Sequence, residues 1–336
     1  MTFLLQQTLI YTVPLLIVAL AGIFAERSGV INLALEGIMI MGAFSGVLTV
    51  YLFQKTGLFT KDSGLLLMLI ALIVAAAAGM LFSLLLAFAA INLKADQTIG
   101  GTALNLMAPA FVLFFINIIT SQNVMNMYTG DAASWFMIKK TDLGFSKTAD
   151  LGVLGETFLG KFYLTTYICI VLYVALSIVL YKTRFGLRLR ACGENPQAAD
   201  SVGINVYKMR YAGVMISGAL SGIGGFTFAL TTANCASTGE VAGFGFLALA
   251  VMIFGQWKPL NTAAAAFLFG FCKCIAAAYT TIDINGDGVY LLREIGINSN
   301  IYRMLPFVIT LVVLAFSSGK SRAPKAEGIP YDKGAR

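Results

Sequence analysis

Polar side chains that could handle a solute lie within otherwise apolar stretches of this sequence. The segment 26–36 places polar groups and a Gly at the mouth of an apolar run, and Gln97, Gly101 and Asn105 follow one another at intervals of four residues, which puts them on one helical face. Polar groups at membrane depth are costly and usually face a bundle interior or a water-filled path. The candidate group is Asn32, Glu36, Asp96, Gln97, Asn105 and Lys273. These amides and carboxylates could pass a polar, uncharged solute; hydrogen bonds that only join helices are the alternative.

Lys273 is the one basic residue well inside a predicted apolar helix. A Lys at that depth reaches the membrane surface poorly, so we expect it to face the interior and to find an acceptor. Glu36, Asp96 and Glu240 are the candidate acceptors. A structural pairing and a role in a solute path both remain open.

The segment 283–294 fits the twelve-position calcium loop of EF-hands, which places acids or amides at positions 1, 3 and 5, Gly at 6 and Glu at 12. The candidate ligands are Asp283, Asn285, Asp287, the backbone carbonyl of Val289, and Glu294. Leu291 offers no side-chain ligand at position 9. The sequence shows no second EF-hand to pair with this one, and apolar runs lie on both sides of the segment. The sequence therefore favours a turn rich in Asp and Asn over a calcium site.

The residue inventory argues against an enzyme. The chain has no His, so Ser-His triads and His-based metal sites are excluded. None of the five Cys stands in a Cys-x-x-Cys pair, which leaves no thiol-based metal site or disulfide framework. No paired carboxylates with a base are visible, and we expect no cofactor bound by this chain.

Composition identifies the scaffold that must position these groups. Of 336 residues, 58% are hydrophobic and only 12% are charged, which predicts an all-α, polytopic membrane bundle. About nine candidate spans, within a range of eight to ten, occupy 7–24, 37–53, 64–91, 101–119, 162–181, 211–231, 242–256, 261–281 and 301–317. Gly42 with Gly46, and Gly218 with Gly222, have the four-residue spacing that lets helices approach closely in lipid.

The stretch 182–210 is a polar island that carries six Lys and Arg residues. Short basic loops stay on the cytoplasmic side, so this island and the basic tail, 320–336, are predicted to be cytoplasmic, and the 120–161 loop to lie outside. The permease domain then covers 1–319. The net charge of +7 reports orientation and contact with anionic lipid rather than binding to nucleic acid.

The middle of the island is predicted to form a short helix, because it has residue types that favour a helix start and a helix end. Asn195 suits the N-cap, Pro196 the first helical position, and Gly203 a left-handed exit. About two turns are too short to be stable alone in water. We expect the helix to be stabilised by packing against the membrane surface or a partner protein.

Several motifs together resemble the permease subunits of ATP-binding cassette (ABC) importers in the branched-chain amino acid and ribose permease superfamily, most of all bacterial nucleoside permeases grouped with simple sugar permeases. They occupy 26–32, 35–37, 95–97, 185–190, 193–200, 203–211, 214–220, 250–255, 323–326 and 330–331. The resemblance covers nearly the whole chain. It implies a type II-like importer fold in a bacterial cytoplasmic membrane.

The resemblance also implies how such a subunit works. Residues 193–204 would form the coupling helix that seats in an ATPase subunit, which binds ATP and Mg²⁺; its members are Gly193, Glu194, Asn195, Pro196, Ala198, Ala199, Asp200 and Gly203. A second related permease would complete the pore, and an extracytoplasmic binding lipoprotein would deliver the solute. The expected function is nucleoside import. A ribose-like sugar permease and an ion-coupled secondary transporter are the alternatives.

Overall fold

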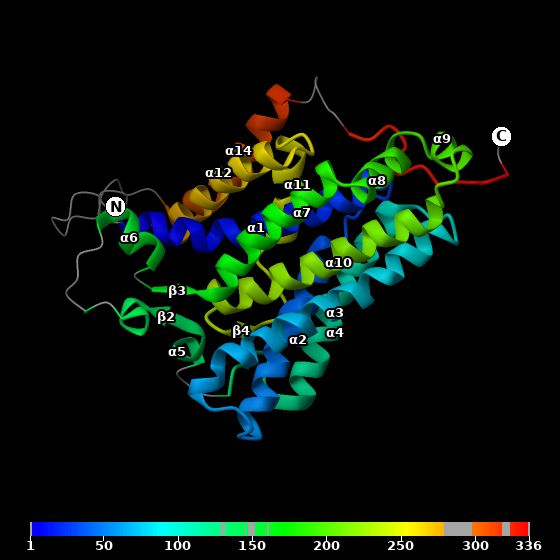
Figure 1. Ribbon diagram of the computed structural model, residues 1–336. Coiled ribbons are helices and arrows are strands. Elements are labelled where there is room, and N and C mark those ends of the chain that lie inside the picture. Colours follow the sequence, from blue (N-terminus) through cyan, green and yellow to red (C-terminus); the bar gives the residue numbers. More distant parts are fainter. Residues whose placement is uncertain are drawn as a thin grey trace.

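The computed structural model describes residues 2–128, 132–144, 146, 152–159, 161–278, 298–317 and 323–334, and these form a bundle of helices (Figure 1). The long helices are α1 (Thr2–Arg27), α2 (Leu35–Lys55), α3 (Gly64–Ile91), α4 (Gln97–Thr120), α7 (Leu164–Lys182), α10 (Val206–Thr231) and α12 (Pro259–Ala278). The shorter ones are α5 (Ala132–Phe136), α6 (Gly152–Leu159), α8 (Arg184–Glu194), α9 (Pro196–Ser201), α11 (Phe244–Phe254) and α14 (Ser299–Ser317), with 3₁₀ turns at Lys61–Ser63 and Lys140–Leu143.

Seven helices in the described ranges are long and apolar enough to cross a membrane, which confirms the helical membrane bundle. The predicted count of about nine is not confirmed. The predicted run at 242–256 contains only the 11-residue α11, which at about 1.5 Å per residue falls well short of a hydrocarbon core of about 30 Å. The run at 301–317 contains α14, whose apolar part is also short. The number of spans beyond these seven stays a prediction, because hydropathy marks an apolar run but does not show how long an apolar helix forms within it.

Close glycine contacts pack α10 against α2 and α3, as the small-residue spacing predicts. A Cβ atom on Gly42 would lie 2.3 Å from the Gly222 carbonyl oxygen, and one on Gly79 would lie 2.3 Å from that of Gly218. Any side chain there would force the backbones apart. Helix α10 is consequently buried over most of its length and lies at the centre of the bundle.

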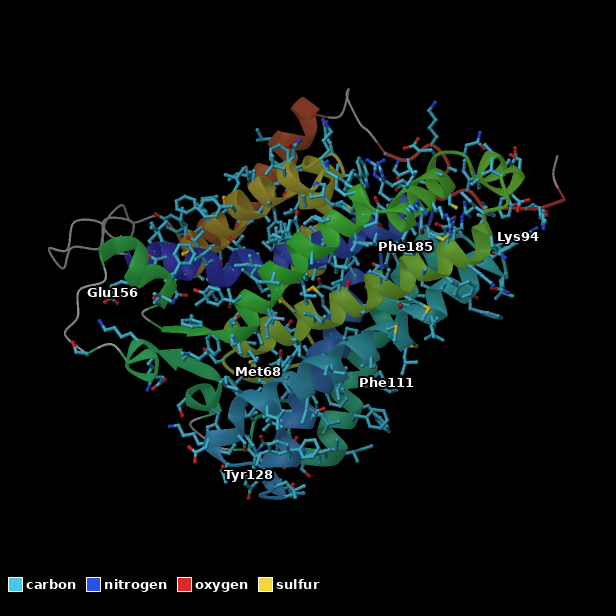
Figure 2. All side chains as sticks on the ribbon, in the orientation of Figure 1. Met68, Lys94, Phe111, Tyr128, Glu156 and Phe185 are labelled. Carbon is cyan, nitrogen blue, oxygen red and sulfur yellow. The ribbon has the colours of Figure 1, made fainter. Side chains whose placement is uncertain are left out.

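The two ends of the bundle differ in construction. Helices α8 and α9 lie with the C-terminal segment at one end, called here the α9 end, and α5, α6, β2 (Met137–Lys139) and β3 (Lys161–Tyr163) lie at the opposite end (Figure 1). There β2 pairs antiparallel with β3, and β1 (Met125–Asn126) pairs antiparallel with β4 (Ala236–Ser237). Figure 2 places Lys94 at the α9 end and Glu156 at the opposite one.

Candidate functional site

Helix α9 is capped at both ends as the sequence predicts. The Asn195 side chain accepts a hydrogen bond from the Ala198 N–H at 3.1 Å, and Pro196 occupies the first turn. Gly203 has a φ of +82°, and its N–H donates to the Asp200 carbonyl at 2.9 Å. The helix therefore has a fixed beginning and a fixed end, although it is only six residues long.

The rest of the polar island is helical too, which corrects the prediction of a loop around one short helix. Its first half is α8, whose N-cap Thr183 accepts a hydrogen bond from the Gly186 N–H at 3.3 Å. Helix α10 begins at Val206, five residues before the predicted span, and Asn205 caps it by accepting from the Lys208 N–H at 2.9 Å. Three consecutive helices with three side-chain caps replace the expected loop with one short helix.

One face of α9 packs against the bundle and the other is exposed to solvent. Ala199 is buried with Cys192 of α8, Val206 of α10 and Tyr331 of the C-terminal segment. The outward side of α9 and its exit carry exposed residues, namely Gln197, Ala198, Ser201 and Val202. Val202, the residue directly after α9, has 74% of its surface exposed. The arrangement presents a rigid knob at the end of the bundle.

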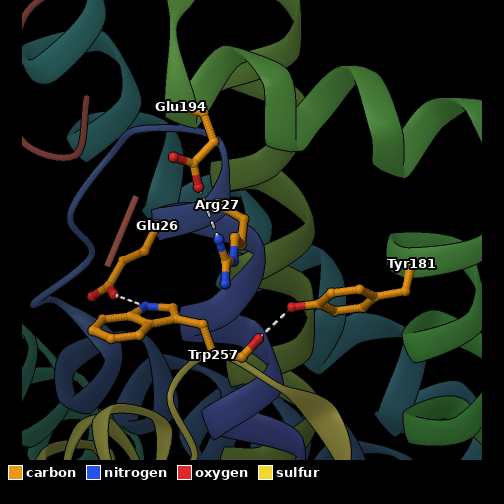
Figure 3. Close-up of polar contacts among 5 residues, drawn as sticks. All are labelled: Glu26, Arg27, Tyr181, Glu194 and Trp257. Carbon is orange, nitrogen blue, oxygen red and sulfur yellow. Dashed lines mark hydrogen bonds and ion pairs between the residues drawn. The ribbon is translucent and has the colours of Figure 1, made fainter. Parts of the chain in front are cut away.

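Contacts with α1 connect this knob to the membrane helices. A Cβ atom on Gly193 would lie 2.4 Å from the Arg27 carbonyl oxygen, so the end of α8 rests directly on the end of α1. Arg27 also forms an ion pair with Glu194 at 3.2 Å (Figure 3). Next to it the buried Glu26 carboxylate accepts from the Trp257 indole N–H at 2.5 Å. The end of α8 and the turn before α12 therefore both contact the end of α1.

The C-terminal residues 323–334 form a strap across the same end. The Ala326 N–H donates to the Gly193 carbonyl at 2.8 Å, and the Ile329 carbonyl accepts from Arg210 at 2.9 Å. Asp332 forms an ion pair with Lys94 at 2.7 Å. The sequence predicted a basic tail in contact with lipid, whereas the described part of the tail is docked on protein; Lys320, Arg322 and Arg336 lie outside the described residues.

A partly buried carboxyl joins the strap to α1. Burial raises the pKa of Glu327 to about 7, while its contacts with Glu26 and with the positive charge of Arg27 act in the opposite direction. The strap thus carries an acid that titrates near neutral pH at its junction with the bundle.

Four of the predicted pathway residues lie together inside the bundle. Each of the three amides bonds to a neighbouring segment: Asn32 donates to the Ser217 hydroxyl at 2.9 Å, Gln97 accepts from the Ile31 N–H at 2.7 Å, and Asn105 accepts from the Gly37 N–H at 2.8 Å and donates to the Leu33 carbonyl at 2.7 Å. Together they hold the non-helical segment between α1 and α2. Their role in a solute path stays a prediction.

Glu36 is the fourth of these residues, and it caps a second helix. Its carboxylate accepts hydrogen bonds from the N–H groups of Gly243, Gly245 and Phe246 at 2.9, 2.6 and 3.3 Å. These N–H groups mark the beginning of α11, where the helix dipole favours a negative charge. Glu36 therefore ties the start of α2 to the start of α11.

Asp96 and Lys273 lie apart from that group. Asp96 is exposed at the α9 end, where it caps α4 by accepting from the N–H groups of Thr98 and Ile99. The ammonium of Lys273 donates to the Ala242 carbonyl at 3.1 Å. In the described ranges it forms no ion pair with Glu36, Asp96 or Glu240, so a carbonyl takes the place of the expected carboxylate. The predicted calcium ligands, Asp283 to Glu294, lie outside the described residues.

Two important side chains escaped the sequence analysis. Arg210 counted only as a loop charge, yet only 1% of its surface is exposed and it holds the strap. Trp257 attracted no notice, yet it is buried between α11 and α12 and its carbonyl accepts a hydrogen bond from the Tyr181 hydroxyl. A signal existed for Trp257, because it is one of only two Trp residues and directly precedes Lys258 and Pro259.

Comparison with known proteins places this architecture among permeases. The family model for the branched-chain amino acid transport system permease component matches residues 4–314. The chain is 40% identical to the guanosine ABC transporter permease protein NupQ of Bacillus subtilis, covering 100% of this chain and 98% of that one. It is 39% identical to the nucleoside ABC transporter permease protein NupC of Lactococcus lactis, covering 97% and 95%.

A second Lactococcus lactis protein, the nucleoside ABC transporter permease protein NupB, is 23% identical over 96% of this chain and 83% of its own length. No solved structure matches the chain.

Proposed function

The chain belongs to the family of branched-chain amino acid transport permease components, and we propose that it is a transmembrane permease subunit of an ABC importer for nucleosides. It is a transport subunit rather than an enzyme. The solute class rests on the two relatives that match the chain over nearly its whole length and are named for guanosine and nucleoside transport.

The observation that carries the mechanism is the knob formed by α9. Its inner residue Ala199 is packed in a buried cluster, whereas Val202 and the residues on either side of it are exposed. A rigid projection of this kind suits a groove in an ATPase subunit, which would bind ATP and Mg²⁺ in place of this chain. The α9 end is then cytoplasmic, with the strap, and the opposite end faces the outside of a bacterial cytoplasmic membrane.

Motion would pass from α9 to the solute path through two connections. The first is direct, because only residues 202–205 separate α9 from α10 at the centre of the bundle. The second passes from Glu194 to Arg27 at the end of α1. Alternating access then follows from rigid-body movement of α1 and α10 against their neighbours. Asn32, Glu36, Gln97 and Asn105 would position the segment between α1 and α2 beside the path.

The remaining partners follow from the same assignment. Lactococcus lactis contains two permeases similar to this chain, NupC and NupB, which supports a pore built from this subunit and a second, related one. An extracytoplasmic binding lipoprotein would supply the solute at the end that carries α5 and α6. The outward side chains of α4, among them Leu106, Phe111 and Phe114, are exposed and would meet lipid or the second permease.

Uptake measurements test this assignment. Cells that lack their own nucleoside uptake would express this chain with its ATPase, second permease and binding protein, and would receive radiolabelled guanosine, adenosine, uridine or ribose. We expect nucleoside uptake that disappears when the Walker A lysine of the ATPase is replaced. Uptake of ribose alone would identify a sugar permease, and uptake that survives the replacement but falls with the ion gradient would identify a secondary transporter. Either result would refute the proposal.

A further inference from the structure

An open pocket of about 430 Å³, called here the Lys273 chamber, lies between five helices. Its wall comes from α1, the end of α10, the start of α11, α12 and α14, and the residues that matter here are Tyr11, Thr232, Ala242, Phe244, Lys273 and Phe307. The volume falls within the range of roughly 300–1,000 Å³ typical of small-molecule sites. Tyr11 precedes Arg27 by more than four helical turns, so the chamber lies about 24 Å from the α9 end.

The chamber differs in chemistry from the other large cavities. Two others, of about 450 and 510 Å³, are grooves between α3 and α4 and between α7 and α12 that are lined mainly by apolar side chains. Such grooves suit lipid tails or a neighbouring helix. The Lys273 chamber combines an ammonium group, a Thr hydroxyl and three aromatic rings, which is the mixture expected where a polar, ring-shaped solute binds.

The side chain of Lys273 is held in place by contacts that leave some of its N–H donors for a solute. An ammonium has three N–H donors, and within the described chain one of them binds the Ala242 carbonyl at 3.1 Å. The charge lies 4.9 Å from the ring centre of Phe244 and 5.6 Å from that of Phe307, within the range of a cation–π contact. Two rings and one carbonyl therefore fix the ammonium at the chamber wall, where further N–H groups can meet a solute.

Within the described residues, Lys273 forms no ion pair with a carboxylate. Glu36 attracts it electrostatically, but both Glu36 oxygens accept hydrogen bonds from the first N–H groups of α11. A cation at membrane depth is costly unless it serves a path or a ligand. The geometry therefore assigns to Lys273 a role in binding rather than in closing an ion pair.

The proposed nucleoside function limits which ligand fits, and the inference rests on that function. Lys can only donate hydrogen bonds. Guanine and hypoxanthine present two acceptors, O6 and N7, on one edge, whereas adenine presents N7 beside an N6 amino donor. We propose that the chamber binds 6-oxopurine nucleosides, with the O6 and N7 edge against Lys273 and the base against the rings of Phe244 and Phe307. The hydroxyl of Thr232, which shares a hydrogen bond of 3.5 Å with that of Thr231, would also face the ribose.

Binding to the purified transporter tests the proposal without the selectivity of the binding protein. The complex of this chain with its second permease and ATPase would be placed in lipid nanodiscs, and [³H]guanosine binding would be measured with unlabelled competitors. We expect inosine to compete as guanosine does, and adenosine and cytidine to compete about 5- to 150-fold more weakly, the range of a bidentate base contact. Lys273→Met should weaken guanosine binding by the same factor and remove this preference, while Lys273→Arg, which keeps the donors, should retain it.

Lys55→Met is the matched control, because Lys55 also lies over an aromatic ring, that of Tyr51 at 5.8 Å, but is exposed at the end of α2. Its guanosine binding should equal that of the wild type. Equal competition by adenosine in the wild type, undiminished binding in Lys273→Met, or no guanosine binding to an intact complex would overturn the chamber assignment. ATP-dependent nucleoside uptake, measured in parallel, would survive these results, so failure of the chamber and failure of the transport function are distinguishable.

Discussion

The carboxylate of Glu26 accepts a hydrogen bond from the indole N–H of Trp257 at 2.5 Å, which links the end of α1 to the turn between α11 and α12 (Figure 3). Both side chains are buried, with 4% of their surfaces exposed. Arg27, the next residue, pairs with Glu194 at the end of α8. Glu26 and Arg27 thus join the end of α1 to the turn between α11 and α12 and to the end of α8.

Trp257→Phe removes the donor and leaves a buried carboxylate oxygen without it. Loss of one partner of a buried polar pair costs about 1–3 kcal/mol, so we expect a lower thermal unfolding temperature for the purified complex. Trp135→Phe is the matched control, since Trp135 is the other Trp of the chain and is half-buried in α5 at the opposite end. Equal effects of the two substitutions would show that the Glu26 contact contributes nothing specific.

Glu327 makes docking of the strap depend on pH. Burial raises its pKa to about 7, above the value of about 4.3 in an unfolded chain, so the protonated form favours the docked state. This stabilisation is complete below about pH 4 and is lost as the pH rises through about 7. Hydrogen exchange should show the protection factors of the Ala326 and Gly328 N–H groups, which bond to Gly193 and Gly29, falling between about pH 4 and 7 and levelling off above about pH 7.

The substitution Glu327→Gln tests the cause of that change. Glutamine imitates the neutral acid, so the protection factors should stay high across the same pH range. A pH dependence that persists in Glu327→Gln would assign the titration to another group at the junction, where Glu26 also lies.

Cys192 can report whether the strap is docked. Burial raises the pKa of this thiol to about 11, and none of its surface is exposed beneath the cluster that includes Tyr331. The wild type should therefore react very slowly with a maleimide. Tyr331→Ala removes the ring that lies 5.3 Å from that of Tyr207 and should speed the labelling of Cys192 at least tenfold. Tyr331→Phe keeps the ring and should behave like the wild type; equal labelling in all three proteins would contradict the packing role.

The features of the α9 end that the sequence predicted are local ones. Asn195, Pro196 and Gly203 act on backbone groups within a few residues of themselves, so their types and spacing suffice to place a helix start and a helix end. The close contact of Gly42 with Gly222 was predictable only as a tendency to pack, because a Gly pattern names no partner.

Features that depend on distant partners could not be predicted. Glu26 and Trp257 are 231 residues apart, and no pattern in either segment refers to the other. The same limit explains the amides: polarity at depth located Asn32, Gln97 and Asn105, but only the fold shows that each of them bonds to a backbone group between α1 and α2. The sequence therefore locates buried polar residues, but it does not show whether they stabilise the fold or contact a solute.

Sidedness can be measured at Val202, because the five cysteines are all buried and give little background labelling. Val202→Cys places a thiol at a site that is 74% exposed at the α9 end, and Tyr128→Cys places one at a site that is 56% exposed far from it. A membrane-impermeant maleimide should label Tyr128→Cys in intact cells and Val202→Cys only in inside-out vesicles. The ATPase subunit should protect Val202→Cys. The reverse pattern of labelling would invert the proposed orientation.

Loss of the Asn195 cap should uncouple ATP hydrolysis from transport. Removing an N-cap side chain costs about 0.5–2 kcal/mol, and a helix of six residues has few other bonds to resist fraying. Asn205→Ala is the matched control, since Asn205 makes the same kind of cap, at 2.9 Å against 3.1 Å, but on the 26-residue, buried α10. We expect Asn195→Ala to lower nucleoside uptake several-fold more than Asn205→Ala at equal amounts of protein in the membrane. ATP hydrolysis by the complex should continue in Asn195→Ala without a matching uptake of nucleoside, because a frayed α9 no longer transmits closure of the ATPase to α10.

If both variants lost uptake equally, the shape of α9 would not be what transmits the signal, and the ion pair between Arg27 and Glu194 would become the leading connection.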